Sequence, residues 1–364
     1  MDGKFAVADF RCWSRLALST LIAVVVAVNG CATTPMPHAR GGATPASGAP
    51  FNPPKLDATI AERLLVLDPD RVTARDVREI LAFAPAPHII LHHGGVYPVY
   101  LVMTSLAKFL KGMGYPEDKL RHPGNGRYSH SPYESSEQIA GLVAWYYEHD
   151  GVRPMLIGHS QGGMQVVRVL HDLAGTFSPS LPVWNPLSDS PEPRTNIVDP
   201  LTGRERPVVG LSVSYASVVG AGGPSGILPN QWKVASRLYE IPDSVDEFTG
   251  YHIGVDLFAW TFAGAGISEF RNHGRVRLNN VVLPADYLHV TVPVTHHLVG
   301  DAATKEWIES YTPRVLREGG PVPGTSLDNV LYAADIWYSV KRHWVLEAQR
   351  LVIATRQKVI ARPD

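Results

Sequence analysis

A serine flanked by glycines, between a buried-strand pattern and a helical pattern, constrains this chain more than any other feature. In the stretch MLIGHSQGGM, residues 155–164, Ser160 lies two positions from both Gly158 and Gly162. The apolar run before it is typical of a buried strand, and the run after it has helical periodicity and ends at Gly175. A turn from strand to helix this sharp excludes side chains on both flanking residues. The sequence therefore predicts a strand-turn-helix unit that presents the serine hydroxyl.

The same alternation of strand and helix patterns extends over most of the chain. Helical spacing is found in segments starting near residues 57, 73, 100 and 131, and apolar strand-like runs are found at 88–95, 152–158 and 208–223, the first and last of which end in glycines. Strands that alternate with helices of this length form parallel sheets. We therefore expect an α/β protein with a mostly parallel central sheet flanked by helices.

Four further segments complete the predicted domain, which covers residues 57–364. Prolines and the turn-like DPLTGRE indicate an irregular insertion at about 176–209, after the helix that follows the serine. FAWTFAGAG, 258–266, is apolar and fits either the core or a lid. Residues 279–297 contain the last strand-like alternation, and 326–357 predict a long amphipathic helix on the outside of the domain.

The N-terminus, residues 1–31, has the pattern of an export signal. Basic residues precede the apolar run Leu16–Val28, which is about 13 residues long, shorter than the roughly 20 needed to cross a bilayer. Val-Asn-Gly-Cys at its end resembles a bacterial lipoprotein box, which implies lipidation at Cys31; an ordinary secretory signal is the alternative. Residues 32–56 are rich in Pro, Gly and Ala and predict a flexible tether. We expect an exported protein of the bacterial cell envelope, attached to a membrane by its N-terminal lipid, or a secreted one.

Cysteine content and charge exclude several classes of partner and site. The two cysteines, Cys12 and Cys31, both lie in the predicted signal, so the mature chain has no thiol for a disulfide or a cysteine-based metal site. Lys+Arg 33 against Asp+Glu 34 leaves a formal net charge of -1. Because nucleic-acid binding requires concentrated positive charge, we expect no nucleic-acid partner.

A glycine pair after the first strand pattern is the candidate partner of the serine turn. HIILHHGG ends in Gly94 and Gly95, where a backbone without side chains approaches a substrate closely. The backbone N–H groups of Gly95 and Gln161 are predicted to form an oxyanion hole.

A serine nucleophile needs a histidine base, and two adjacent candidates follow the last strand-like segment. His296 and His297 end the alternation LHVTVPVTHH, and His296 is preferred because it comes first after the predicted strand. His289 is expected to lie within that strand, in the core or facing the sheet. The triad acid is expected at Asp256, behind the β-rich run EFTGYHIGVD, with Asp246 and Glu247 as alternatives.

Adjacent histidines do not indicate a metal centre here. His92-His93 and His296-His297 are neighbours in sequence, and neighbours rarely bind one ion. The chain has no HExxH motif. We expect no metal and no cofactor.

Together, LHHGG and IGHSQGGM resemble the α/β-hydrolase superfamily, in particular its lipases and esterases. The resemblance covers about residues 85–310 and implies a serine hydrolase that cleaves carboxylic esters of small molecules or lipids, with Ser160, His296 and Asp256 as catalytic triad. An acyltransferase on the same fold is one alternative. The other is a non-catalytic lipid-binding or envelope scaffold protein that retains the fold.

Overall fold

The structure is a computed structural model that describes residues 56–95, 97–222, 231–253, 268–284, 286–313 and 329–360. All of them belong to the compact unit Pro50–Asp364. The predicted signal peptide, Cys31, almost all of the tether, the segment 258–266 and Asp256 lie outside the described residues.

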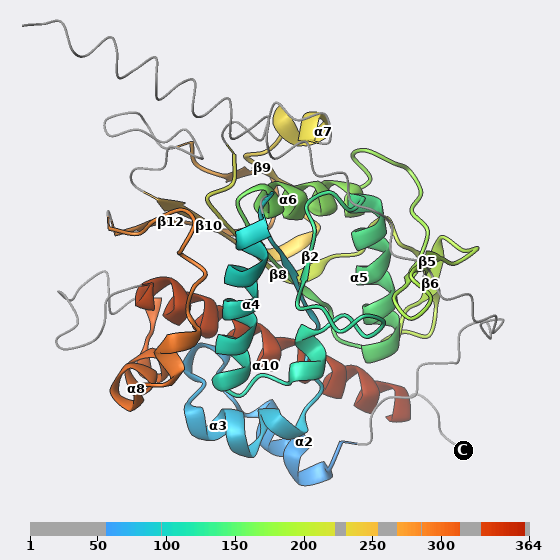
Figure 1. The fold of residues 1–364 in the computed structure, drawn as a ribbon. Coiled ribbons are helices and arrows are strands. Elements are labelled where there is room, and N and C mark those ends of the chain that lie inside the picture. The colour runs from blue at the N-terminus through green and yellow to red at the C-terminus, as the bar shows by residue number, and fades with distance from the viewer. Residues whose placement is uncertain are drawn as a thin grey trace, which may run out of the picture. The chain divides into compact units, whose positions relative to one another are not determined.

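A six-stranded sheet in the order β12-β10-β8-β3-β1-β2 forms the centre of the fold (Figure 1). Every neighbouring pair in it is parallel. The strands are β1 (Ile89–His92), β2 (Ser129–His130), β3 (Met155–His159), β8 (Val213–Val219), β10 (Val245–Ile253) and β12 (Arg277–Leu283). The predicted α/β class with a parallel central sheet is confirmed.

Helices cover both faces of this sheet, which explains why its central strands are apolar throughout. The helices α5 (Ser136–Asp150) and α6 (Gln161–Leu173) pack on one face, and α4 (Tyr97–Gly112) and α10 (Val330–Ile360) pack on the other. Alternate strand residues contribute to the two cores, so Leu156 packs with α5 and α6 while its neighbours pack with α4 and α10.

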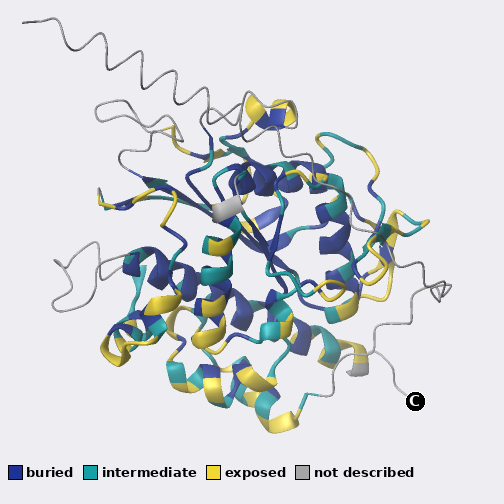
Figure 2. Ribbon diagram, viewed as in Figure 1, coloured by how far each residue is buried: buried dark blue, intermediate teal, exposed yellow. Residues whose placement is uncertain are grey.

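The C-terminal helix α10 is buried, not on the outside of the domain as the sequence suggested. Trp337 and Trp344 are fully buried on it, and dark blue covers most of this helix in Figure 2. Three N-terminal elements, α2 (Ala58–Leu65), η1 (Pro69–Arg71) and α3 (Ala74–Glu79), lie on its far side (Figure 1), and α8 (Ala302–Ser310) packs beside it. An amphipathic pattern cannot show that segments distant in sequence cover the second face.

Shorter elements surround this framework. The insertion after α6 contains two antiparallel pairs, β4 (Trp184–Asn185) with β5 (Ser190–Pro191) and β6 (Asn196–Val198) with β7 (Glu205–Pro207). The other short elements are η2 (Leu81–Phe83), η3 (Glu117–Leu120), α7 (Trp232–Ala235), β9 (Glu240–Ile241), β11 (Arg271–Asn272) and η6 (His296–Val299). Among the described residues, no helix combines the length and apolarity that a membrane crossing requires.

The last strand ends earlier than the sequence pattern indicated. β12 stops at Leu283, directly before Pro284, and the described residues from 286 to 295 form turns and irregular backbone. Proline has no N–H to continue the parallel ladder. Leu288 and Val290, whose alternation looked like a strand, are exposed on these turns. His289 is therefore a loop residue that follows the final strand.

Candidate active site

Ser160 occupies the turn between β3 and α6 in a backbone conformation that residues other than glycine rarely adopt. Its φ is 55° and its ψ is -126°, and it forms the N-cap position of α6. Its N–H donates to the carbonyl of Val219 on the neighbouring strand over 2.9 Å. Strained backbone of this kind persists only where the surroundings hold it, and it is concentrated at functional sites.

The glycines on either side of Ser160 are required by close backbone contacts. A Cβ atom at Gly158 would lie 2.5 Å from the carbonyl oxygen of Gly162. A Cβ atom at Gly162 would collide with the carbonyl oxygens of His92 and His93 at the end of β1. The G-x-S-x-G spacing therefore reports a real steric need in this chain, and it also brings the turn against the loop after β1.

The loop after β1 lies beside Ser160. A Cβ atom at Gly94 would lie 3.1 Å from Cβ of Ser160 and 3.5 Å from its Oγ. At Gly95 an added Cβ would collide with the side-chain carbonyl of Gln161. Four of the residues selected from sequence, Ser160, Gln161, Gly94 and Gly95, are thus in one place.

A buried charge cluster that the sequence analysis missed supports this loop. The carboxylate of Glu134 lies 2.8 Å from His130 Nδ1 and 2.9 Å from the Arg127 guanidinium, and the His130 carbonyl accepts the N–H of His93 over 3.1 Å. Burial alone would raise the pKa of Glu134, but His130 and Arg127 hold it at about 2. The available signal was the run of polar residues 127–134 around the short strand β2, at the same sheet edge as Gly94.

Tyr133, the neighbour of Glu134, is a second residue that the sequence analysis did not select. Its hydroxyl donates to the carbonyl of Gly95 over 3.2 Å, while 57% of the residue's surface remains exposed. It therefore borders the glycine loop from the solvent side.

His289 also lies against the serine turn. The Nε2 of His159, the residue directly before Ser160, donates to the His289 carbonyl over 2.7 Å, and the two rings are 5.0 Å apart between centroids. His289 is buried, with 8% of its surface exposed. The hydroxyl of Ser160 forms no hydrogen bond within the described residues, so the placement of His289 rests on its main chain and on the His159 contact.

His296 and His297 lie farther along the chain, on the short helix η6. Both begin η6, and both are exposed. The N–H of His296 donates over 3.0 Å to Ser105 Oγ, which is eight residues past Tyr97 on α4. At 1.5 Å per residue this point is about 12 Å along α4 from the end that adjoins the glycine loop. The main chain at His296 thus lies farther from the serine turn than that at His289.

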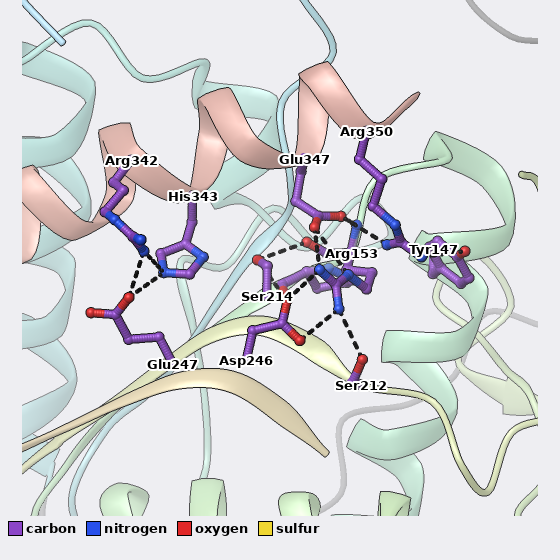
Figure 3. Close-up of polar contacts among 11 residues, drawn as sticks. Tyr147, Arg153, Ser212, Ser214, Asp246, Glu247, Arg342, His343, Glu347 and Arg350 are labelled. Atoms are coloured by element: carbon purple, nitrogen blue, oxygen red, sulfur yellow. Dashed lines mark hydrogen bonds and ion pairs between the residues drawn. The ribbon is translucent and has the colours of Figure 1, made fainter. Parts of the chain in front are cut away.

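The alternative acids, Asp246 and Glu247, lie at the amino edge of the sheet, which is the end at which its parallel strands begin. The serine turn lies at the carboxyl edge, where the strands end. Glu247 is in register with Met155 through β8, and Met155 precedes Ser160 by five residues, roughly 16 Å of strand. Figure 3 shows Glu247 facing Arg342 and His343 of α10. Burial would raise the pKa of Glu247, but these two partners lower it below its usual value.

Asp246 pairs with Arg153 in the same region over 2.9 Å. Neither carboxylate is within reach of the serine turn.

The carboxyl end of β10, in contrast, lies close to the serine turn. Tyr251 near this end is in register with Val219 of β8, and Val219 is in register with His159 of β3. Asp256 follows this strand end in the chain and lies outside the described residues.

Of the adjacent histidines His92 and His93, the first ends β1 and the second follows it directly in the loop. His92 is fully buried, and burial together with nearby His130 lowers its pKa well below the ordinary value, so this imidazole is neutral. His93 Nδ1 lies 2.7 Å from the carbonyl oxygen of Gly94. The part of the chain that the structure describes holds no group of three or more His, Cys, Asp or Glu side chains placed to bind a metal ion.

The fold and the site define an α/β protein with a strained serine at the carboxyl edge of a parallel sheet, next to a glycine loop and a histidine loop. No protein-family model matches the chain, and no curated protein matches it. The function of the chain is therefore inferred from the geometry and chemistry of the site.

Proposed function

We propose that this chain is a serine hydrolase of the α/β-hydrolase fold that cleaves carboxylic esters, with Ser160 as nucleophile. The observation that carries the proposal is the conformation of Ser160, φ 55° and ψ -126°, between a buried strand and a helix N-terminus and against the Gly94-Gly95 loop. Such a turn exposes a hydroxyl while the first N–H of the helix points toward the same space.

The strand order supports the same fold. The strand that bears the nucleophile, β3, lies in the middle of the sheet, β1 with the glycine loop is its neighbour on one side, and β8, β10 and β12 follow on the other. In the α/β-hydrolase arrangement the nucleophile, the acid and the histidine come in this chain order, at the carboxyl ends of successive strands. Ser160, Asp256 and a histidine after β12 fit that order.

We assign the general base to His289 in place of His296. Three observations support this: His289 follows the end of β12, it is buried, and its main chain is bonded to the residue next to Ser160. His296 is exposed and bound to α4. Asp256 is kept as the acid because it follows β10 in the chain, and β10 ends at the carboxyl edge of the sheet, where Ser160 lies. Asp246 and Glu247 form ion pairs at the amino edge.

The reaction follows from these positions. Ser160 Oγ attacks the ester carbonyl carbon while His289 takes the hydroxyl proton, and the backbone N–H groups of Gln161 and Gly95 stabilise the negative oxygen. The bond to the alcohol then breaks, and His289 gives its proton to the leaving alcohol. Water attacks the acyl-enzyme in the same way, which releases the acid and restores Ser160.

The first prediction concerns a covalent adduct at Ser160. Residues 32–364 treated with a fluorophosphonate should gain the mass of one adduct, because only an activated serine reacts, and Ser160→Ala should gain none while losing ester hydrolysis by about 10⁴-fold or more. Ser188→Ala, a change at an exposed serine of the insertion, is the matched control and should be labelled normally. A folded chain without any adduct would contradict the hydrolase and favour the lipid-binding alternative.

We also propose that the chain is exported and attached to a membrane by a lipid on Cys31. The support is the sequence pattern of residues 1–31. In a bacterial host, the full chain should incorporate labelled palmitate and partition into detergent, and Cys31→Ser should lose both properties. Cys12→Ser is the control and should retain them; equal labelling of the two variants would refute the anchor.

A further inference from the structure

The residue before the proposed nucleophile makes a contact that the hydrolytic mechanism does not use. His159 ends β3 with its side chain fully buried, and its Nε2 lies 2.7 Å from the His289 carbonyl oxygen. The two residues are 130 positions apart in the chain. A single side chain thus joins the serine turn to the loop that carries the proposed base.

Other hydrogen bonds of that loop are local turns or contacts with the start of α10. The carbonyl of Pro284 accepts the N–H of Tyr287, and the carbonyl of Leu288 accepts the N–H groups of Thr291 and Val292. The side-chain amide of Asn329 donates to the carbonyls of Thr291 and Val294. The bond from His159 differs from these, because it ties the backbone of His289 itself to the nucleophile strand.

We propose that His159 is a positioning residue: its Nε2–H, donated to the His289 carbonyl, sets the backbone of His289 so that the imidazole is directed at Ser160. The proposal rests on the proposed function. A carbonyl can only accept, so the ring form that makes this bond carries a hydrogen on Nε2. Because effective catalysis requires the base within a few tenths of an ångström of its place, a small loop shift is expected to reduce the rate.

A histidine is not needed here for packing alone. A buried polar ring is costly unless it is hydrogen-bonded, and a leucine would fill similar space. What leucine cannot do is bind the carbonyl of His289. Glutamine can, because its side-chain amide nitrogen reaches about as far as Nε2.

The test compares His159→Leu with His159→Gln on the chain of residues 32–364, with p-nitrophenyl butyrate as substrate. We expect His159→Leu to lower kcat by about 10- to 100-fold with KM changed by less than about threefold, and to shift the acidic limb of the kcat/KM profile, because a displaced imidazole has different neighbours. His159→Gln should restore kcat to within about threefold of the native chain.

The matched control is His171→Leu. His171 is also buried and also binds a main-chain carbonyl through Nε2, that of Glu240 over 2.9 Å, but it lies ten residues beyond Gln161, roughly 15 Å along α6. Its loss should cost stability comparable to that of His159→Leu and leave kcat and the pH profile unchanged.

Two results would overturn the proposal. Native kcat and an unchanged pH profile in His159→Leu would show that the bond does not position the base. Equal losses in folded His159→Leu and His159→Gln would show that the ring shape, not the donated hydrogen bond, matters. Failure of the proposed function gives a different result, since the native chain would then form no fluorophosphonate adduct at Ser160.

Discussion

The two edges of the central sheet use buried polar groups in opposite ways. At the amino edge, where β3 and β10 begin, Arg153 and Glu247 are joined to carboxylates and cations of their surroundings, including Glu347 and Arg342 of α10 (Figure 3). At the carboxyl edge, the Ser160 hydroxyl has no hydrogen bond to a described residue, and a strained turn holds it. The charged groups named at the amino edge are thus paired, whereas the Ser160 hydroxyl at the carboxyl edge has no partner among the described residues, as the proposed nucleophile requires.

The largest expected effect is that of replacing the proposed base, His289, at the carboxyl edge. His289→Asn should lower kcat by about 10³-fold or more, because Ser160 would lose its proton acceptor, and His296→Ala should remain within about twofold of the native chain. Steady-state hydrolysis of p-nitrophenyl butyrate measures both. The reverse outcome, a loss in His296→Ala alone, would restore the assignment that the sequence suggested.

The sequence predicted some parts of the candidate site better than others. The serine turn and the glycine loop were predictable because each is a local pattern whose glycines meet a local steric need. The proposed base, His289, was not selected from sequence, because Leu288-His289-Val290 alternates like a strand although Pro284 has already ended β12. Alternation in sequence cannot separate a half-buried strand from a turn with exposed apolar residues.

Long-range packing accounts for the other differences. The burial of α10 depends on α2 and η1, which lie near the other end of the chain in sequence. Asp246 and Glu247 remained possible acids in sequence because only the register of β10 with β8 and β3 shows that they lie at the wrong edge. The cluster around Glu134 depends in the same way on the pairing of β2 with β1.

A second prediction concerns stability at the amino edge, where Arg153 has two acidic partners. Glu347 is buried, with 1% of its side chain exposed, and Asp246 is 51% exposed; both bind Arg153. Glu347→Gln should lower the free energy of unfolding by about 3 kcal/mol, because it removes the buried one of the two carboxylates that neutralise Arg153, and Asp246→Asn should lower it by less than about 1 kcal/mol.

Urea unfolding measures this difference, and ester hydrolysis by both variants should stay within about twofold of the native rate. Equal destabilisation by the two variants would contradict the dependence on burial. A large loss of activity in a folded Glu347→Gln would contradict the separation of the two edges.

The last prediction concerns the charge cluster around Glu134, which lies at the carboxyl edge. Its pKa is about 2 in the folded chain against an ordinary value of 4.5, so folding favours the charged form. The group therefore contributes up to about 3 kcal/mol of stability above pH 5, and this contribution falls as the pH falls from 4.5 toward 2. By pH 3 more than half of it should be lost.

Urea unfolding of the native chain and Glu134→Gln between pH 7 and pH 3 measures this contribution as the difference between the two. The difference should be largest at pH 7 and shrink below pH 4.5, while Glu137→Gln, at a carboxylate that is 44% exposed, should change the free energy of unfolding at pH 7 by less than about 1 kcal/mol. A difference that stays constant down to pH 3 would refute a buried, ionised Glu134. If the difference shrinks as expected, the carboxyl edge also contains a paired charge, placed beneath the glycine loop where it supports the backbone without occupying the space in front of Ser160.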